Sequence, residues 1–339
     1  MIRIAINGFG RIGRTFLRVI MQDPQLLKTL NVVAINIGPA QLQCIAHMFT
    51  YDTLMGTFQQ PVCIEDGYLC IATQRIKLIA ECNPDNINWK TFDIDLVVDC
   101  SGRFTCPDDA ARHLKAGARY VLISAPAKGE LVTIIPGVNE ETFDAAKDHI
   151  VSLGSCTTNA CVPPLKVLQD AFTITSGFMT TVHAYTNSQV LLDVEEKDLR
   201  RARAAALNII PTSTGAGALI GKILPALHGR IEAQALRVPV AKVSMINLVV
   251  HTEQQVSAKA VNDTFKQIAN SALKGILAVT DEPLVSSDFS GNSHSVIIDS
   301  LMTQTVGSLV NLYGWYDNEW GYSCRLKDFA LMLNKRLNP

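Results

Sequence analysis

The chain has 339 residues, of which 48% are hydrophobic and 18% are charged, and its formal net charge is −1. This composition excludes a disordered chain, and the near-zero charge gives no sign of a nucleic-acid or membrane partner. No apolar run approaches the roughly 20 residues of a membrane helix, and no export signal is evident, so we expect a cytoplasmic protein. The nine cysteines are scattered without a C-x-x-C pair, which predicts reduced thiols and no metal site.

In the first half of the chain, strand-like apolar runs alternate with helix-like stretches. Apolar runs that do not alternate with polar residues suit strands buried on both faces, as in a parallel sheet. We therefore predict a Rossmann-type, doubly wound α/β domain over residues 1–154, which binds a dinucleotide. The expected strands are 3–7, 32–36, 94–100, 120–124 and 149–153, the expected helices are 12–21 and 108–116, and a hairpin is expected within 62–80 around Asp66-Gly67.

We predict a second, catalytic domain over residues 155–318, with a different pattern of strands and helices. Its strand-like segments are longer and several alternate, which is typical of an α+β domain with a mostly antiparallel sheet. Pro163 and Pro164 should bend or interrupt the first helix of this domain. In the second half of the chain the expected strands are 178–185, 232–238, 242–251, 296–300 and 309–315, and the expected helices are 156–171, 214–224 and 258–272, with a further helix at 320–337 beyond this domain.

The segment INGFGRIGR, residues 6–14, lies between the first strand and the first helix. Gly8, Gly10 and Gly13 have the G-x-G-x-x-G spacing, in which glycines permit a tight turn, a close approach to pyrophosphate, and helix packing. A plain structural turn is the alternative, but the strand–turn–helix context favours a dinucleotide site. The second strand ends in Asn36 and Ile37, without the acidic residue that usually holds the ribose hydroxyls.

Cys156 follows a strand-like run and opens a helix within the segment SCTTN. A helix N-terminus stabilises a thiolate, which should lower the pKa of this thiol, and its N–H groups can hold an oxyanion. The polar neighbours Ser155 and Thr157 argue against a merely buried cysteine. We therefore expect Cys156 to be a nucleophile and the other eight cysteines to be small buried hydrophobic residues.

A thiolate nucleophile needs a base nearby. Among the seven histidines, His183 ends a strand-like run, where functional residues collect, so it is the candidate base. A purely structural histidine is the alternative at this position.

Eight motifs, in order along nearly the whole chain, resemble those of phosphorylating glyceraldehyde-3-phosphate dehydrogenases. They are INGFGRIGR, CSGRF at 100–104, ISAPAKG at 123–129, SCTTN at 155–159, TTVHAYT at 180–186, DLRRARAAALNIIPTSTGA at 198–216, LRVPVAKVS at 236–244 and WYDNEWGYS at 315–323. The resemblance implies a cytoplasmic homotetramer of glycolysis and gluconeogenesis. Its reaction would oxidise glyceraldehyde 3-phosphate with NAD, through a cysteine thioester, and release 1,3-bisphosphoglycerate after attack by inorganic phosphate.

The resemblance also implies roles for individual residues. Cys156 would be the nucleophile and His183 the base. Thr186 and Arg237 would bind the substrate phosphate, with Arg201 nearby. The residues implied for inorganic phosphate are Ser155, Thr157, Thr214 and Gly215. The residues implied for the cofactor, beside the three glycines, are Arg11, Ile12, Ser124 and Asn318. The helix at 319–339 would return to the first domain and complete it.

Three positions depart from the family pattern. Ile37 stands where NAD-specific members usually carry aspartate, so NADP is left open as a cofactor. Glu195, in a loop that resembles one contacting a neighbouring subunit's cofactor, would repel a 2′-phosphate, and we favour NAD. Cys82 replaces an arginine near the adenine, which predicts weaker cofactor binding.

Two other functions stay open at this point: an erythrose-4-phosphate dehydrogenase, and a non-catalytic nucleotide-binding or moonlighting protein. Thr186 and the segment STGA at 213–216 argue against the first, and Cys156 with His183 argues against the second.

Overall fold

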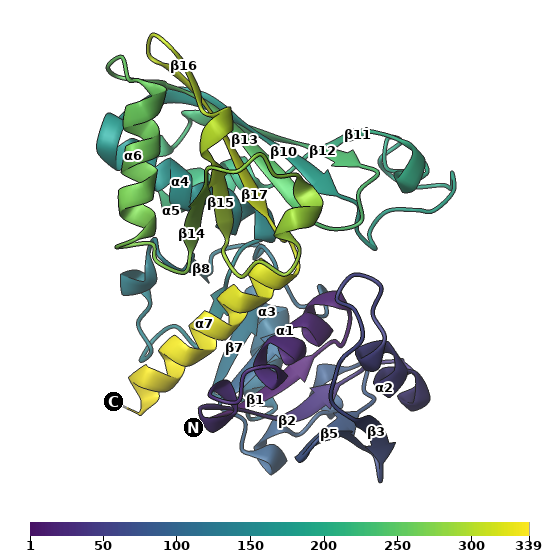
Figure 1. Ribbon diagram of the computed structural model, residues 1–339. Coiled ribbons are helices and arrows are strands. Elements are labelled where there is room, and N and C mark those ends of the chain that lie inside the picture. The colour runs from purple at the N-terminus through teal and green to yellow at the C-terminus, as the bar shows by residue number, and fades with distance from the viewer. Residues whose placement is uncertain (339) are drawn as a thin grey trace. The chain divides into compact units, whose positions relative to one another are not determined.

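The computed structural model describes residues 1–338, which divide into two compact units (Figure 1). Unit 1 comprises Met1–Ile134, Glu140–Gly154 and the residues from Ser323 onward. Unit 2 comprises Ile135–Asn139 and Ser155–Tyr322. Of the C-terminal segment 319–339, Pro339 lies outside the described residues.

Unit 1 contains a nine-stranded sheet in the order β3-β4-β5-β2-β1-β6-β7-β9-β8. Its pairs are parallel except for β3–β4 and β4–β5, so the predicted Rossmann-type sheet is confirmed. The central strand β1 is almost fully buried, as a strand covered on both faces must be. The strands are β1 Ile2–Asn7, β2 Leu30–Asn36, β3 Val62–Glu65, β4 Tyr68–Ile71, β5 Gln74–Ile79, β6 Leu96–Asp99, β7 Tyr120–Ile123, β8 Val132–Thr133 and β9 Ile150–Ser152.

The helices of unit 1 are α1 Arg11–Met21, α2 Leu42–Thr50, α3 Pro107–Lys115 and most of α7 Trp320–Leu337. The last helix packs on the segment that follows β8, where the rings of Phe143 and Phe329 lie 5.3 Å apart. The sequence analysis missed α2, because only Ile45 and Phe49 of this helix are buried and its apolar periodicity is weak.

Unit 2 contains a mixed sheet in the order β11-β12-β10-β13-β17-β15-β14, with β16 paired to β17. The β10–β12 and β14–β15 pairs are parallel and the other five are antiparallel, as predicted for a mostly antiparallel sheet. The edge strand β14 was missed because it is short and only one of its residues is fully buried. The strands are β10 Ile174–Ala184, β11 Ile210–Thr212, β12 Ile231–Val238, β13 Ser244–Thr252, β14 Leu277–Thr280, β15 Val296–Asp299, β16 Gln304–Val306 and β17 Leu309–Tyr316.

One core lies between this sheet and the helices α4 Cys156–Phe172, α5 Ala216–Ile223 and α6 Ala258–Ala269 (Figure 1). Alternate residues of β13, Ile246, Leu248 and Val250, enter it, which is the two-residue period of a strand with one buried face. Helix α4 runs through Pro163 and Pro164 without interruption, so an interrupted helix is ruled out and the bend remains a prediction. Both prolines are buried.

No helix within residues 1–338 combines the length and apolar character that a membrane crossing requires.

Candidate active site

The glycine loop of unit 1 connects β1 to α1, and two of its three glycines lie where a side chain would not fit. Gly8 has φ +91°, and a Cβ there would meet Ser101 N at 2.6 Å. A Cβ at Gly13 would lie 2.3 Å from Gly8 O, so the helix packs directly on the turn. Beside Gly10, by contrast, the space is open. The two tight positions shape the loop, and the open one leaves its backbone accessible to a ligand.

The start of helix α1 suits an anion. Gly10 is its N-cap and offers no side-chain hydrogen bond, and the first turn contains no acidic residue. The exposed N–H groups and the helix dipole therefore favour a negatively charged group such as a pyrophosphate. These features and the open space at Gly10 fit a dinucleotide.

Arg11 and Ile12, the first residues of α1, are both partly exposed. The Arg11 guanidinium forms an ion pair with Asp52. Asp52 also accepts hydrogen bonds from the backbone N–H groups of Leu54 and Met55, at 2.9 and 3.0 Å. Asp52 thus holds the side chain of Arg11, a role that no sequence signal indicated.

The carboxyl ends of β1, β2 and β6 share a buried polar network. Asn36 donates to Asn7 at 2.7 Å, Asn7 donates to Asp99 at 2.8 Å, and His113 lies 3.2 Å from the same carboxylate. Ile37, beside this network, is buried. Its side chain is therefore not displayed on the surface of unit 1, and it offers no acceptor for a ribose.

Ser124 follows the next strand, β7, and is partly exposed. Its backbone N–H donates to Asp99 O at 2.9 Å, and its side chain hydrogen-bonds the thiol of Cys100, whose sulfur is buried although the residue as a whole is partly exposed. Burial raises the pKa of that thiol to about 12, so Cys100 stays protonated.

In unit 2, Cys156 is the first residue of α4. Ser155 caps this helix, since its Oγ accepts a hydrogen bond from Thr158 N at 3.0 Å. The loop before the cap contains Gly154 at φ +61°, a conformation that favours glycine. The cap and the glycine fix the point at which the chain turns into the helix, and with it the position of the thiol.

His183 lies near the end of β10 and brings its ring to this thiol. Cys156 Sγ lies 3.5 Å from His183 Nε2. On the other side of the ring, Nδ1 lies 2.6 Å from the carbonyl oxygen of Ala184. A carbonyl only accepts, so we assign the proton to Nδ1, which leaves Nε2 as an acceptor facing the sulfur.

The imidazole of His183 is held neutral. Burial, and then the positive charge of Arg237, lower its pKa to about 3, and the hydrogen bond to Ala184 only partly opposes them. The neutral imidazole presents Nε2 as an acceptor to the thiol beside it, which makes His183 the candidate base.

The thiol of Cys156 does not show the lowered pKa expected from the helix N-terminus. Burial raises its pKa, and this effect outweighs the charge of Arg237 and the hydrogen bonds from Thr157, which act in the opposite direction. The resting pair is therefore a thiol beside a neutral imidazole.

The expectation that the other eight cysteines are buried is wrong for most of them. Only Cys161 and Cys324 are buried, whereas Cys44, Cys63 and Cys82 are exposed.

Two guanidinium groups provide positive charge at this site. Arg237 lies opposite His183 in the β10–β12 register. Burial lowers the pKa of Arg237, and the charge of Arg201 lowers it further. The Nε atoms of both arginines are buried without a hydrogen-bond partner. Within residues 1–338 neither arginine forms an ion pair with a carboxylate. Two neighbouring guanidinium groups with unused donors fit a phosphate dianion.

The hydroxyl groups predicted to bind phosphate differ in their surroundings. Thr186 is partly exposed and contacts Ser188, with 3.0 Å between the two hydroxyl oxygens. Thr214 and Gly215 precede helix α5, whose N-cap is Gly215. Thr157 instead turns inward, and its hydroxyl lies 3.0 Å from that of Tyr316. Its side chain therefore supports the fold beneath the site.

Tyr316 is a buried residue that the sequence analysis did not single out, although it stands in the motif WYDNEWGYS. Its hydroxyl lies 2.7 Å from that of Thr181, and its ring meets the His183 ring edge-on at 5.9 Å. This contact fixes the imidazole plane. Asn318, two residues along the chain, accepts a hydrogen bond from Ser244 at 3.2 Å through Oδ1.

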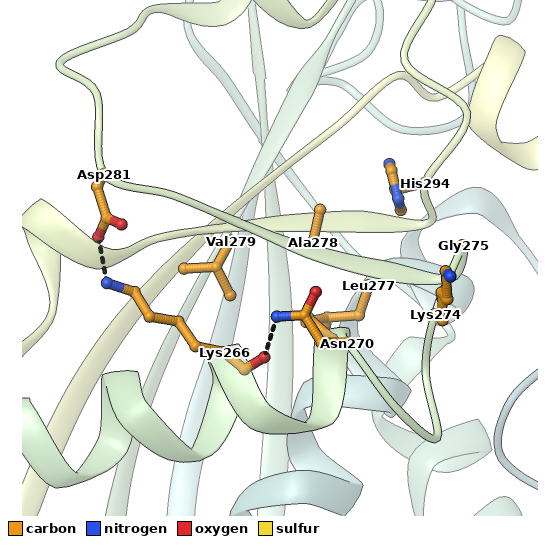
Figure 2. A pocket seen from close by; sticks show the side chains of 10 residues that line it. Lys266, Asn270, Lys274, Gly275, Leu277, Ala278, Val279, Asp281 and His294 are labelled. Carbon is orange, nitrogen blue, oxygen red and sulfur yellow. Dashed lines mark hydrogen bonds and ion pairs between the residues drawn. The ribbon is translucent and has the colours of Figure 1, made fainter.

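A cavity of about 490 Å³ lies elsewhere in unit 2, between α6 and β14 (Figure 2). It is lined by none of the predicted site residues. Lys266 and Asp281 form an ion pair of 2.7 Å at its rim (Figure 2). We assign this cavity no part in the site around Cys156.

Two family models match the chain. One, described as "Glyceraldehyde 3-phosphate dehydrogenase, NAD binding domain", matches residues 2–107. The other, described as "Glyceraldehyde 3-phosphate dehydrogenase, C-terminal domain", matches residues 155–318. The NAD cofactor implied by the first agrees with the fit of the glycine loop to a dinucleotide.

The chain is similar to curated proteins over nearly its whole length. It is 46% identical to glyceraldehyde-3-phosphate dehydrogenase 2 of Bacillus subtilis (strain 168), over 99% of this chain and 98% of the relative. It is 45% identical to glyceraldehyde-3-phosphate dehydrogenase of Geobacillus stearothermophilus, over 97% of each. The chain belongs to the glyceraldehyde-3-phosphate dehydrogenase family.

Proposed function

We propose that this protein oxidises glyceraldehyde 3-phosphate with NAD and phosphorylates the product to 1,3-bisphosphoglycerate. The observation that carries the proposal is the distance of 3.5 Å between Cys156 Sγ and His183 Nε2, beside the unpaired charge of Arg237. Family membership supports the substrate, and the chemistry of the site supports the reaction type.

In the proposed first step, the Cys156 sulfur attacks the aldehyde carbon while His183 Nε2 takes the thiol proton. The developing alkoxide takes up this proton, and a hemithioacetal forms on Cys156. The N–H groups at the start of α4 stabilise the negative charge on oxygen. Arg237, Arg201 and Thr186 hold the phosphate of the substrate, which orients the aldehyde toward the sulfur.

In the second step, His183 removes the hydroxyl proton of the hemithioacetal as the carbon is oxidised to a thioester. NAD, when bound, accepts the hydride from that carbon. Gly8, Gly10, Gly13, Arg11 and Ile12 would hold its pyrophosphate, and Ser124 and Asn318 its nicotinamide half. Asn318 Oδ1 is already engaged by Ser244, so the side-chain NH₂ is the group offered to the carboxamide.

In the third step, an oxygen of inorganic phosphate attacks the thioester carbon, the C–S bond breaks, and Cys156 leaves as a thiolate. The thiolate regains the proton held by His183, and the proton that the phosphate loses passes to solvent. Ser155, Thr157, Thr214 and Gly215 form the proposed phosphate site. Because Thr157 directs its hydroxyl to Tyr316, we assign its contribution to the backbone N–H at the start of α4.

We favour NAD over NADP for this chain. Neither Ile37, which is buried, nor its neighbour Asn36 presents a free carboxylate or cation. Glu195 is exposed in the loop 186–203, and its charge would disfavour a 2′-phosphate if the loop reaches a neighbouring subunit's cofactor. Direct comparison of binding to NAD and NADP tests this preference.

We further propose a homotetramer, with the cytoplasmic location that the family resemblance implies. The loop 186–203 exposes three leucines, Leu191, Leu192 and Leu199, at 85%, 73% and 82% of their surface. Large apolar side chains gathered on one exposed loop are typical of a surface that another subunit covers.

The test of the function is a spectrophotometric assay of NAD reduction. We expect rapid reduction with glyceraldehyde 3-phosphate that depends on inorganic phosphate. Faster turnover with erythrose 4-phosphate, independent of phosphate, would replace the proposal with the erythrose reaction. No reduction with either sugar phosphate would indicate a non-catalytic binding protein.

A further inference from the structure

Two cysteines far along the chain from Cys156 lie opposite each other in the β3–β4 hairpin of unit 1. Cys63 of β3 pairs in register with Cys70 of β4. They are the two cysteines found in strands within residues 1–338. Residues directly opposite in an antiparallel pair project from the same face, so the two thiols share one face of the hairpin.

The geometry of the hairpin sets the separation of these two residues. Its turn residues Asp66 and Gly67 have φ values of +50° and +76°, which is the type I′ conformation of a two-residue turn. Such a turn is flanked by a hydrogen-bonded pair, and the pairs alternate, so Cys63 and Cys70 are again of that type. Their Cα atoms are then about 5.5 Å apart, within the roughly 4.4–6.8 Å that a disulfide spans.

The two thiols are near each other and are accessible from solvent. Besides burial, the Cys63 thiol contributes to the raised pKa of the Cys70 thiol, Cys63 is exposed, and Cys70 is partly exposed. Arg75 lies opposite Cys70 in the β4–β5 register. Burial raises the pKa of the Cys70 thiol, and the charge of Arg75 opposes that rise. The more exposed Cys63 is therefore the thiol that meets an oxidant first.

We propose that Cys63 and Cys70 form a reversible dithiol–disulfide site whose reaction partner is a low-molecular-weight disulfide. The Cys63 thiolate attacks one sulfur of this reagent, breaks its S–S bond and releases one thiol. Cys70 then attacks the Cys63 sulfur of the mixed disulfide and releases the second thiol. Two protein thiols and one small disulfide thus give one protein disulfide and two small thiols, with electrons and protons balanced.

The new bond would stabilise one of the two edges of the nine-stranded sheet, because β3 is the outermost strand on that side. An edge strand pairs on one side only and opens more readily than a central strand. A covalent link between β3 and β4 prevents the hairpin from separating. Amide exchange in residues 62–71 should slow on oxidation, while the reaction at Cys156 requires neither cysteine.

The experiment treats the full-length protein with oxidised glutathione, blocks the remaining thiols by alkylation, and maps the peptides by mass spectrometry. We expect a peptide pair linked through Cys63 and Cys70, lighter by two hydrogen atoms, free of glutathione, and restored by dithiothreitol. In Cys70→Ser, which lacks the second thiol, glutathione should accumulate on Cys63. Cys82→Ser, which removes an exposed cysteine outside the hairpin, is the matched control and should leave the link unchanged.

Two results would overturn the proposal. One is glutathione retained on both Cys63 and Cys70, which would mean that the thiols cannot reach each other. The other is that both hairpin thiols stay free, and are alkylated, under conditions in which glutathione attaches to Cys44 and Cys82. Amide exchange of the hairpin that is equal before and after formation of the link would contradict the proposed effect on the sheet edge.

Discussion

His183 and Arg237 stand opposite each other in the parallel strands β10 and β12, with 2.5 Å between Nδ1 and Nη1. Both also approach the carbonyl oxygen of Ala184, at 2.6 Å for Nδ1 and 3.0 Å for Nη1. With the proton of His183 on Nδ1, both groups donate to that oxygen. One carbonyl therefore orients the proposed base and the proposed phosphate ligand together.

The first prediction concerns the base. His183→Asn should lower kcat by about 10²–10⁴-fold, because no acceptor remains at the position of Nε2 to move the proton. Steady-state kinetics of NAD reduction measures the change. His251→Asn is the matched control, since His251 is exposed on β13 and hydrogen-bonds Ser308. A kcat for His183→Asn within twofold of the control would rule out a catalytic role for this imidazole.

The second prediction concerns the anion site. Arg237→Gln should raise KM for glyceraldehyde 3-phosphate by about 10–100-fold, the loss of one or two charge-assisted hydrogen bonds to a phosphate. Arg230→Gln removes a positive charge just before the other end of β12, where Arg230 donates to Ile174 O at 3.0 Å. This control should retain the original KM. Equal KM values for the two variants would remove Arg237 from the phosphate site.

The third prediction concerns Asp52 and pH. Burial acts to raise the pKa of Asp52, but the hydrogen bonds from Arg11, Met55 and Leu54 outweigh it and hold the pKa below its ordinary value. The pKa of an aspartate in the unfolded chain is about 3.9. A carboxyl group whose pKa is lower than this in the folded protein stabilises the fold at every pH above about 3.9, and this stabilisation is lost as the pH falls below that value.

Asp52→Asn should therefore destabilise the protein at pH 7 by about 1 kcal/mol. Thermal unfolding of both proteins across a pH series measures the difference. It should persist from pH 7 to about pH 4 and shrink only at lower pH. A difference that already fades between pH 7 and about pH 5 would contradict the lowered pKa.

The fourth prediction concerns subunit association. Leu199→Glu places a charge on the exposed loop 186–203 and should shift the proposed tetramer toward smaller species, because a buried unpaired carboxylate is costly. Light scattering coupled to gel filtration measures the mass. Val306→Glu is the control, since Val306 is 77% exposed but lies in the β16–β17 hairpin. If both variants have the same mass as the parent protein, the loop is not an essential subunit contact.

Both sheets could be predicted from the sequence, because the burial of a strand determines which of its positions carry apolar residues. Apart from Arg3, every residue of β1 is buried, whereas buried and less buried residues alternate in β13, so the first indicates a strand covered on both faces and the second a strand covered on one. Short or exposed elements leave no such pattern. The edge strand β14 and the exposed helix α2 were missed for that reason.

Site residues could be predicted where a reactive side chain stands at the end of a strand or the start of a helix, because both features are visible within one segment of the sequence. Cys156 at a helix start and His183 near a strand end were both identifiable, and their distance of 3.5 Å is the structure's contribution. Contacts between distant segments left no local signal. Asp52 reaches Arg11 across 41 residues, and Tyr316 reaches Thr157 across 159. The direction of the Cys156 pKa was missed because burial depends on the whole unit rather than on the helix start.

The most direct test is capture of the acyl-enzyme. The protein is mixed with glyceraldehyde 3-phosphate and NAD without inorganic phosphate, quenched in acid, and analysed by mass spectrometry. The account predicts a phosphoglyceroyl group on the peptide that contains Cys156, its removal when phosphate is added, and no such group in a folded Cys156→Ser variant. An acyl group on another residue, or turnover by Cys156→Ser, would contradict the assignment of the nucleophile.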